Sequence, residues 1–323
     1  MKRSVLMLLL LAQLVVSPPT HFAGAAEPPI RMAVLQSDIH QLAFWVALEK
    51  GFFIKNGVSV EVAGIFKAGP EIMTAFSAGE LDMAYVGEAP ATTAVANKAA
   101  SVVVVAQVNT EGSALVIAKD NTAIKSLADL KGKTVAIPGH STVQDFLLRK
   151  ALKNAGIDPA AVNIIVLKPP EMISALRTGQ IDAFIAWEPH PSKAATMGVG
   201  QNLATSGGMW PGHPCCVLVT DKKFIAKHPE KVRAVVAAHV QATDYIRRNA
   251  EEAIAIGVKS TGMDEATVRK AMQNVHFTYE LNVEGEKEYV RFLSELGLIR
   301  IENPDGFVDQ FLQPKILREI LHK

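Results

Sequence analysis

The feature that most constrains the fold is a stretch of 21 residues that the chain repeats one hundred positions later. Residues 70–90 read PEIMTAFSAGELDMAYVGEAP and residues 170–190 read PEMISALRTGQIDAFIAWEPH, with the same residue at six matched positions. The identities include a glycine and an aspartate, Gly79 and Asp82 in the first copy. Each copy has the pattern of a helix with proline in its first turn and glycine at its end, followed by a short apolar strand. The repeat therefore predicts two α/β lobes of similar wiring.

Strand-like and helix-like segments alternate around both copies. The strand-like segments are 30–36, 58–65, 81–87, 101–108, 113–119 and 133–139, and the helix-like segments are 40–53, 68–79, 89–100 and 141–156. This alternation is typical of an α/β fold in which each lobe is a mostly parallel sheet flanked by helices. From about residue 221 the pattern becomes helical, and we expect these helices to pack back on the first lobe.

The first 26 residues are predicted to be a signal peptide. A basic start precedes the apolar run 5–16, which is too short to span a membrane, and small residues suit cleavage near Ala25 or Ala26. The only cysteines are Cys215 and Cys216, so no lipid-attachment cysteine follows the run. We therefore expect an exported, periplasmic protein that is not inserted in the membrane.

The net charge excludes partners that need a strongly basic surface. Without the two basic residues of the signal peptide, the chain has 31 Lys and Arg against 32 Asp and Glu. This balance gives no electrostatic argument for binding nucleic acid or an anionic membrane.

The loops that follow the strands are the candidate ligand site, because ligands of open α/β sheets bind outside the C-terminal ends of the strands. These loops are 36–41, 66–70, 87–91, 139–143 and 187–191, and we expect the segment 208–217 to join them. Several of them open a helix, whose free N–H groups suit an anionic ligand. In the best instance, residues 139–142, Ser141 or Thr142 either caps the helix or binds the ligand.

The candidate ligand-binding residues share a place in these loops and a polar, aromatic or small side chain. They are Ser37, His40, Gln41, Gly87, Glu88, Ala89, Gly139, His140, Ser141, Thr142, Trp187, Glu188, His190, Trp210, His213 and Cys215. Trp187 and Trp210 offer a flat apolar wall or a cation–π face. Two inward carboxylates, Glu88 and Glu188, would favour a zwitterion or an amine over a bare anion. The other interpretation is that they cap helices or form ion pairs outside the cleft.

The histidines and cysteines of these loops leave two interpretations open. They are either ordinary loop residues or ligands of a metal ion or metal chelate, although the spacing H-x-C-C is no recognised zinc pattern. Adjacent Cys215 and Cys216 are expected on a strand, pointing to opposite faces. A hidden pair of His213 with one of these cysteines would make an exported enzyme, but no G-x-S-x-G, phosphate-binding loop or H-E-x-x-H motif occurs.

Several motifs resemble the periplasmic substrate-binding proteins of ABC importers, in the group that binds nitrate, taurine, alkanesulfonates and thiamine precursors. The resemblance covers about residues 30–320. It is carried by ALEKGFF (47–53), AGPEIMTAFSAGELDMAYVGEAP (68–90), SLADLKGKTVAIPGHST (126–142), QIDAFIAWEP (180–189) and FIAKHPEKV (224–232).

This resemblance implies a two-lobed periplasmic binding fold, type II-like, that closes over a ligand. The crossover strands would lie near residues 112–119 and 216–221. One lobe would then comprise 27–113 and 219–323, and the other 114–218.

The resemblance also implies a monomer without cofactor or resident metal that delivers its ligand to an ABC permease and performs no chemistry on it. The expected ligand is a small organic anion or zwitterion of the sulfonate or taurine kind. Nitrate, bicarbonate, a pyrimidine thiamine precursor and a metal chelate are the alternatives, and a ligand sensor would have the same sequence.

Overall fold

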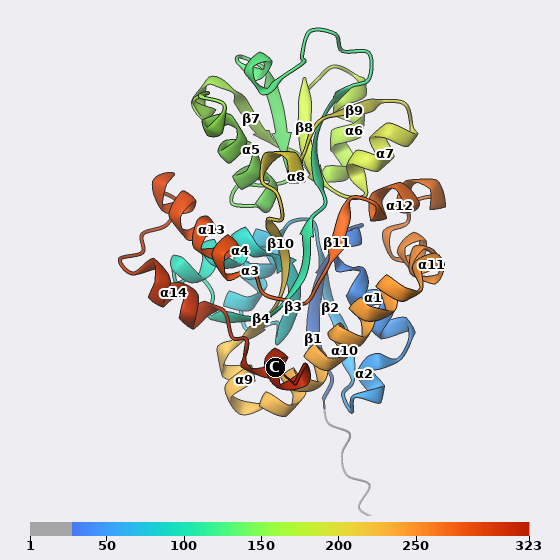
Figure 1. Ribbon diagram of the computed structural model, residues 1–323, viewed down its shortest axis with the longest axis vertical. Coiled ribbons are helices and arrows are strands. Elements are labelled where there is room, and N and C mark those ends of the chain that lie inside the picture. Colours follow the sequence, from blue (N-terminus) through green and yellow to red (C-terminus); the bar gives the residue numbers. More distant parts are fainter. Residues whose placement is uncertain (1–27, 323) are drawn as a thin grey trace, which may run out of the picture.

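The chain forms two α/β lobes that stack along the long axis of the molecule (Figure 1). The structure is a computed structural model that describes residues 28–322, so the predicted signal peptide lies outside the described residues. Within residues 28–322, no helix combines the length and the apolar character needed to cross a membrane.

The first lobe is built on a six-stranded sheet of order β11-β4-β10-β3-β1-β2. Its strands are β1 (Ile30–Leu35), β2 (Val60–Phe66), β3 (Met83–Gly87), β4 (Val102–Glu111), β10 (Pro214–Asp221) and β11 (Val275–Phe277). Its helices are η1 (Ile39–Gln41), α1 (Leu42–Glu49), α2 (Phe52–Lys55), α3 (Gly69–Ser77), α4 (Glu88–Ala96), α9 (Lys222–Lys227), α10 (Pro229–Arg248), α11 (Ala250–Thr261), α12 (Glu265–Met272), α13 (Val283–Glu295), α14 (Pro304–Phe311) and α15 (Lys315–Ile320). The expectation that the C-terminal helices return to this lobe is confirmed, since α10 packs on α1 and α13 on α4.

The second lobe is built on a five-stranded sheet of order β7-β6-β8-β5-β9. Its strands are β5 (Ser113–Ala118), β6 (Thr134–Ile137), β7 (Asn163–Val166), β8 (Ala183–Trp187) and β9 (Gly200–Thr205). Its helices are η2 (Leu127–Leu130), α5 (Val143–Asn154), η3 (Pro159–Ala161), α6 (Pro169–Arg177), α7 (His190–Thr196) and α8 (Ser206–Met209). The chain enters this lobe from β4 into β5 and returns through α8 into β10 (Figure 1).

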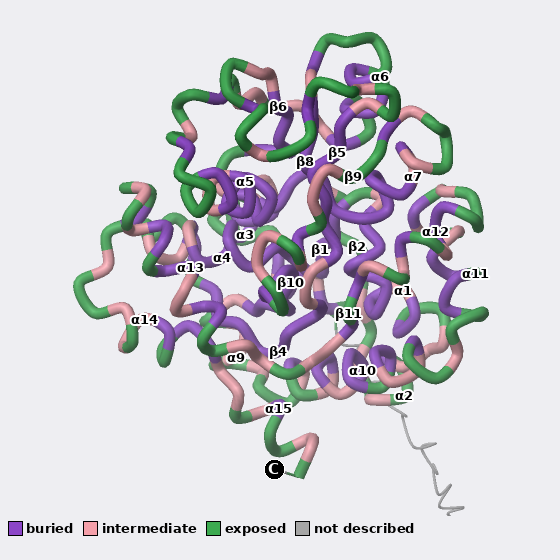
Figure 2. The backbone as a smooth tube through the Cα atoms, turned by 45° about the horizontal axis from the view of Figure 1, so that its top comes forward, coloured by how far each residue is buried: buried purple, intermediate pink, exposed green. Residues whose placement is uncertain are grey.

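The two-lobed α/β class is confirmed, but both sheets are mixed where mostly parallel sheets were expected. β1 pairs in parallel with β2 and β3, and β6 with β7 and β8. The strands beside the two crossings run the other way: β10 is antiparallel to β3 and β4, and β5 to β8 and β9. Each crossing carries the chain from a strand that ends at the cleft into one that begins there, so β5 and β10 run opposite to the strands beside them. Figure 2 colours β4, β8 and β10 almost wholly as buried.

The glycine and the aspartate that the two copies of the repeat share have structural roles. The Asp82 carboxylate accepts a hydrogen bond from Arg31 N, and Asp182 accepts one from Thr134 N, each at 2.8 Å. Gly79 has φ +74° and ends α3 in the left-handed conformation that favours glycine. In each lobe the repeated aspartate thus ties the start of one strand to the loop that precedes its neighbour.

The lobes are closed on one another. Lys168 of lobe 2 pairs with Glu71 of lobe 1 at 2.8 Å, and Lys193 with Asp264 at 2.7 Å. Main-chain contact adds to these pairs, since Ile39 N donates to the carbonyl of Glu188. The cleft between the lobes is therefore seen in its closed form.

Candidate functional site

A small inner cavity lies between the lobes, at the C-terminal ends of β1, β3 and β8. Its volume is about 20 Å³, room for about one water molecule. The twelve residues that line it are Leu35, Asp38, His40, Gly69, Gly87, Pro90, Thr142, Val143, Gln144, Trp187, Cys215 and Cys216. Both lobes contribute to this lining, as expected of a cleft at the ends of the strands.

His40, Cys215 and Cys216 form a buried cluster on the lobe 1 side of this cavity. Their ligand atoms all lie within 4.8 Å of one another. Nδ1 of His40 is 3.4 Å from Sγ of Cys215 and 3.8 Å from Sγ of Cys216. Both cysteines are free thiols.

The expectation that the two thiols point to opposite faces is wrong, because β10 carries a bulge at this point. In the register of β10 with β4, Pro214 pairs with Thr110 and Cys216 with Asn109. Cys215 is the extra residue between them, and an extra residue cancels the alternation of a regular strand. Both sulfur atoms therefore reach the same imidazole.

The ring of His40 is held by a glycine at the crossing from β4 to β5. His40 Nε2 donates to the carbonyl of Gly112 at 2.7 Å, which leaves Nδ1 facing the sulfur atoms. Gly112 has φ +87°, and a Cβ there would lie 2.4 Å from Nε2. Only glycine allows this approach. Asp38 Oδ1 completes the surroundings: it accepts from His40 N at 2.9 Å and lies 3.7 Å from Nδ1.

Electrostatics inside the cluster favour one charged thiol. Burial raises the pKa of Cys215, but the hydrogen bond with Cys216 and the charge of His40 outweigh it and lower this pKa well below its usual value. Burial lowers the pKa of His40, while Cys215 and Asp38 raise it to about 9. The hydrogen bond to Cys215 and burial raise the pKa of Cys216. These shifts make Cys215 the thiol of the cluster that most readily loses its proton.

The two repeated glutamates are engaged outside the inner cavity. Glu88 accepts from Gln107 Nε2 at 3.0 Å beside Glu286, and burial raises the pKa of Glu88 to about 7. Glu188 accepts from Asn274 Nδ2 at 2.7 Å, a bond between lobes, and from Ser192 N at 3.1 Å. Burial raises the pKa of Glu188 as well. Neither carboxylate is among the residues that line the cavity.

The structure brings five of the sixteen candidate residues to the inner cavity: His40, Gly87, Thr142, Trp187 and Cys215. Thr142 has the capping role that was left open, since its Oγ1 accepts from Asp145 N at 3.2 Å at the start of α5. The eleven candidates that do not line the cavity are Ser37, Gln41, Glu88, Ala89, Gly139, His140, Ser141, Glu188, His190, Trp210 and His213.

Three of these eleven are involved in packing. His190 is buried, and burial lowers its pKa to about 3. His213 stacks on Trp210, which also packs against Phe146 and Tyr289.

Sequence reasoning missed seven lining residues: Leu35, Asp38, Gly69, Pro90, Val143, Gln144 and Cys216. Asp38 carried a usable signal, because an aspartate directly before a helical segment is a typical N-cap, and Asp38 caps η1. Cys216 was not among the candidates, because two thiols on opposite faces of a strand would not both reach the cleft, and the bulge removes that alternation.

A second hollow, here called the outer hollow, adjoins the inner cavity across Trp187. It measures about 180 Å³, and its lining residues are Gln36, Lys67, Lys168, Pro169, Pro170, Glu171 and Trp187. Lys67 comes from lobe 1 and Lys168 from lobe 2, so the two lobes bring positive charge together at this hollow.

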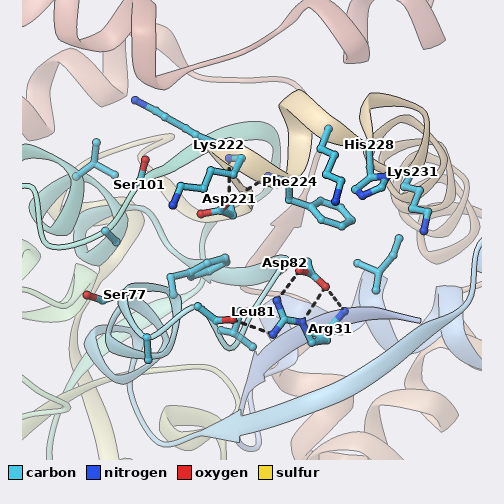
Figure 3. A pocket seen from close by; sticks show the side chains of 18 of the residues that line it. Arg31, Ser77, Leu81, Asp82, Ser101, Asp221, Lys222, Phe224, His228 and Lys231 are labelled. Carbon is cyan, nitrogen blue, oxygen red and sulfur yellow. Dashed lines mark hydrogen bonds and ion pairs between the residues drawn. The ribbon is translucent and has the colours of Figure 1, made fainter. Parts of the chain in front are cut away.

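A much larger hollow of about 1160 Å³ lies at the opposite end of lobe 1 (Figure 3). Two of its charged groups are used locally: Arg31 pairs with Asp82 at 2.7 Å, and Asp221 caps α9 through Lys223 N and Phe224 N. It borders the N-terminal ends of β1 and β3, where open α/β sheets do not bind ligands. We assign no ligand to it.

Residues 24–259 match the model of the NMT1-like family. The chain belongs to the NMT1-like family. A Brucella abortus (strain 2308) protein named as a binding protein is 30% identical over 231 residues, which cover 71% of this chain and 70% of the relative. The taurine-binding periplasmic protein of Escherichia coli K12 is 32% identical over 177 residues, 55% of this chain and 54% of that protein.

Solved structures agree with this NMT1-like assignment at the level of the fold. A ligand-binding component of an ABC-type import system from Staphylococcus aureus, solved with zinc bound, superposes with a TM-score of 0.79 at 18% identity. The match covers 91% of this chain and 99% of that structure. This NMT1-like chain therefore has the fold of a two-lobed periplasmic binding protein.

Proposed function

We propose that the protein is the periplasmic substrate-binding component of an ABC importer. It captures a small ligand by closing its lobes and delivers it, as a monomer and without chemical change, to a membrane permease. The observation that carries this proposal is a closed cleft lined by both lobes, which two crossings of the chain join. A ligand that contacts both lobes stabilises the closed form over the open one. The family and the binding proteins among its relatives support the same role.

For the ligand we propose a small organic anion or zwitterion that occupies the outer hollow. Lys67 and Lys168 supply positive charge from facing lobes, and Glu171 supplies one carboxylate. This set is complementary to a sulfonate that also carries an ammonium group, although Lys168 already pairs with Glu71. The taurine-binding relative supports the same chemistry.

Trp187 supplies the directional contact in this proposal. Among the described residues, Nε1 of Trp187 is buried and has no hydrogen-bond partner. An unsatisfied buried donor costs about 1–3 kcal/mol, which a ligand oxygen would recover. Since Trp187 lines both hollows, a sulfonate oxygen in the outer hollow is the partner that we assign to it.

A thermal-shift panel tests the function and the ligand together. It should contain taurine, short alkanesulfonates, nitrate, bicarbonate and an aminopyrimidine. A ligand at about a hundred times its Kd adds roughly 2.7 kcal/mol to the free energy of unfolding. If no compound raises the melting temperature, the organic-anion proposal is contradicted.

Trp187→Phe tests the directional contact. It should weaken sulfonate binding about tenfold, the loss of one hydrogen bond of about 1.4 kcal/mol. Trp210→Phe is the matched control, because Trp210 packs against Phe146 away from the outer hollow. Equal affinities in wild type and Trp187→Phe would remove Trp187 from the proposed site.

A further inference from the structure

We propose that His40, Cys215 and Cys216 form a site for a thiophilic metal ion of the Zn²⁺ class at the inner end of the cleft. The proposal deepens the proposed function and rests on it only for the role of the cleft. The site itself rests on the geometry of three side chains. It adds a cation beside the organic ligand proposed for the outer hollow.

The spacing of the donor atoms fits tetrahedral coordination. Zinc binds cysteine sulfur at about 2.3 Å and histidine nitrogen at about 2.0 Å, so N and S ligands of one ion lie about 3.5 Å apart. Nδ1 of His40 lies 3.4 and 3.8 Å from the two sulfur atoms. An ion could therefore bind with little movement of the three side chains.

The imidazole is already oriented as a metal ligand. Ligating histidines usually donate their other ring N–H to a carboxylate or a backbone carbonyl, which fixes the tautomer and the direction of the free nitrogen. His40 Nε2 does this with the carbonyl of Gly112 at 2.7 Å. Asp38, 3.7 Å from Nδ1, stands where it can take a fourth position or bind a metal-bound water.

Size and charge both favour a single cation at this point. The inner cavity of about 20 Å³ holds an ion but no organic molecule. None of the twelve described residues that line it is Lys or Arg, and Asp38 adds a carboxylate. Two thiolates and a neutral imidazole also balance the charge of a divalent ion. Thiolate ligands select zinc and softer ions over Mg²⁺ or Ca²⁺.

The competing explanation is a thiol–imidazole cluster that only stabilises the closed cleft. Hydrogen bonds to sulfur have lengths similar to those observed, so distances alone do not separate the two. A measurement that reports sulfur coordination does.

Cobalt binding tests the site. Untagged protein, kept reduced with a phosphine, is titrated with Co²⁺ and then with Zn²⁺ in competition. We expect one equivalent of cobalt, a thiolate-to-cobalt charge-transfer band, the intense visible bands of tetrahedral cobalt, and displacement by zinc. Absence of the charge-transfer band would overturn the proposal.

Three variants and a control locate the ion. His40→Gln, Cys215→Ser and Cys216→Ser should each lower zinc affinity by more than the 10–100-fold that loss of an outer partner typically costs. His140→Gln is the control, an exposed histidine of a neighbouring loop whose removal should change nothing. Unchanged affinity in the three cluster variants would also overturn the proposal.

A measurement on the wild-type protein avoids the risk that a variant loses zinc affinity because it misfolds. Zinc should protect Cys215 and Cys216 of the wild-type protein from alkylation, located by mass spectrometry, and a chelator should restore the reaction. Alkylation at an unchanged rate in the presence of zinc would contradict the site.

The two proposals fail separately. In the first case a sulfonate closes the lobes, which solution scattering records as a smaller radius of gyration, but no cobalt band appears. This result would overturn the metal site and leave the capture function. A cobalt band that the cluster variants abolish, with no closure by any compound, would support the metal site and count against the capture function.

Discussion

The two copies of the repeat show how the same sequence pattern serves different purposes in the two lobes. In the middle of each copy the roles match, since Asp82 accepts from Arg31 N of β1 and Asp182 accepts from Thr134 N of β6. At the end they differ. Glu88 is buried in lobe 1 beside Glu286, whereas Glu188 reaches from lobe 2 to Asn274 of lobe 1. Identity within the repeat therefore predicts shared wiring and says little about the site.

The residue before each glutamate shows the same divergence. Gly87 has no side chain, and a Cβ there would lie 3.1 Å from Val143 of the other lobe. The matching Trp187 fills the space between the inner cavity and the outer hollow. Lobe 1 thus supplies the His40, Cys215 and Cys216 side chains and, at Gly87, the space that lets Val143 approach. Lobe 2 supplies the Trp187 ring that separates the two hollows.

Removal of the repeated aspartates tests the shared wiring and has the largest expected effect. Asp82→Ala should lower the free energy of unfolding by about 3 kcal/mol, because Asp82 also binds the guanidinium of Arg31. Asp182→Ala should cost about 1–2 kcal/mol, since one strand N–H loses its partner. Urea denaturation measures both, with Asp82→Asn as the control that keeps an acceptor. Equal costs would mean that the Arg31 pair contributes nothing.

Two buried histidines, one in each lobe, give the second test. His239 of lobe 1 binds the Tyr85 hydroxyl at 3.0 Å and the Gln107 carbonyl at 2.8 Å. His239→Leu should therefore cost about 2 kcal/mol, because it leaves two buried groups unpaired. In the described structure His190 of lobe 2 has no hydrogen-bond partner at either ring nitrogen. His190→Leu should leave stability unchanged or raise it, and a loss as large as that of His239→Leu would contradict this assignment.

The same pair predicts an acid response. Burial lowers the pKa of His190 to about 3 and that of His239 to about 4, whereas an unfolded histidine titrates near 6.5. As the pH falls below about 6.5 the unfolded chain takes up protons first, so stability present above that pH is lost toward pH 4. His190→Leu should lose less stability than wild type between about pH 6 and pH 4.5, measured by denaturation at each pH.

The ion pairs across the cleft should have the smallest effect. Lys193 pairs with Asp264 between lobes, and Lys259 pairs with Glu49 within lobe 1, both partly exposed. Exposed pairs contribute about 0.2–1 kcal/mol, so Lys193→Gln should weaken binding of the panel ligand by at most about fivefold, less at high salt. Lys259→Gln is the control and should leave affinity unchanged. Equal effects in the two variants would show that the first pair does not stabilise closure.

Sequence predicted the lobes because helix and strand patterns are local. The repeat, the alternation of elements and the left-handed Gly79 all follow from neighbouring residues. The mixed sheets did not follow, because the direction of β5 and β10 depends on how the chain crosses between lobes. Strand direction at such a crossing is a tertiary property.

The site was harder to predict because it depends on register. Thr142 and His40 were found from their loops, but Cys216 was lost to a bulge that only the pairing of β10 with β4 reveals. Trp210 and His213 looked like site residues and instead pack on each other, since loop position does not fix side-chain direction.

The two hydrogen bonds to the carbonyl of Gly112 limit which substitutions the inner cavity can accept during evolution. The carbonyl accepts from His40 Nε2 in lobe 1 and from Glu188 N in lobe 2, at the point where the chain crosses between them. A descendant that replaced His40 would leave this carbonyl with one donor fewer at the crossing between the lobes. A substitution at position 40 would thus alter the inner cavity and a contact between the lobes at the same time.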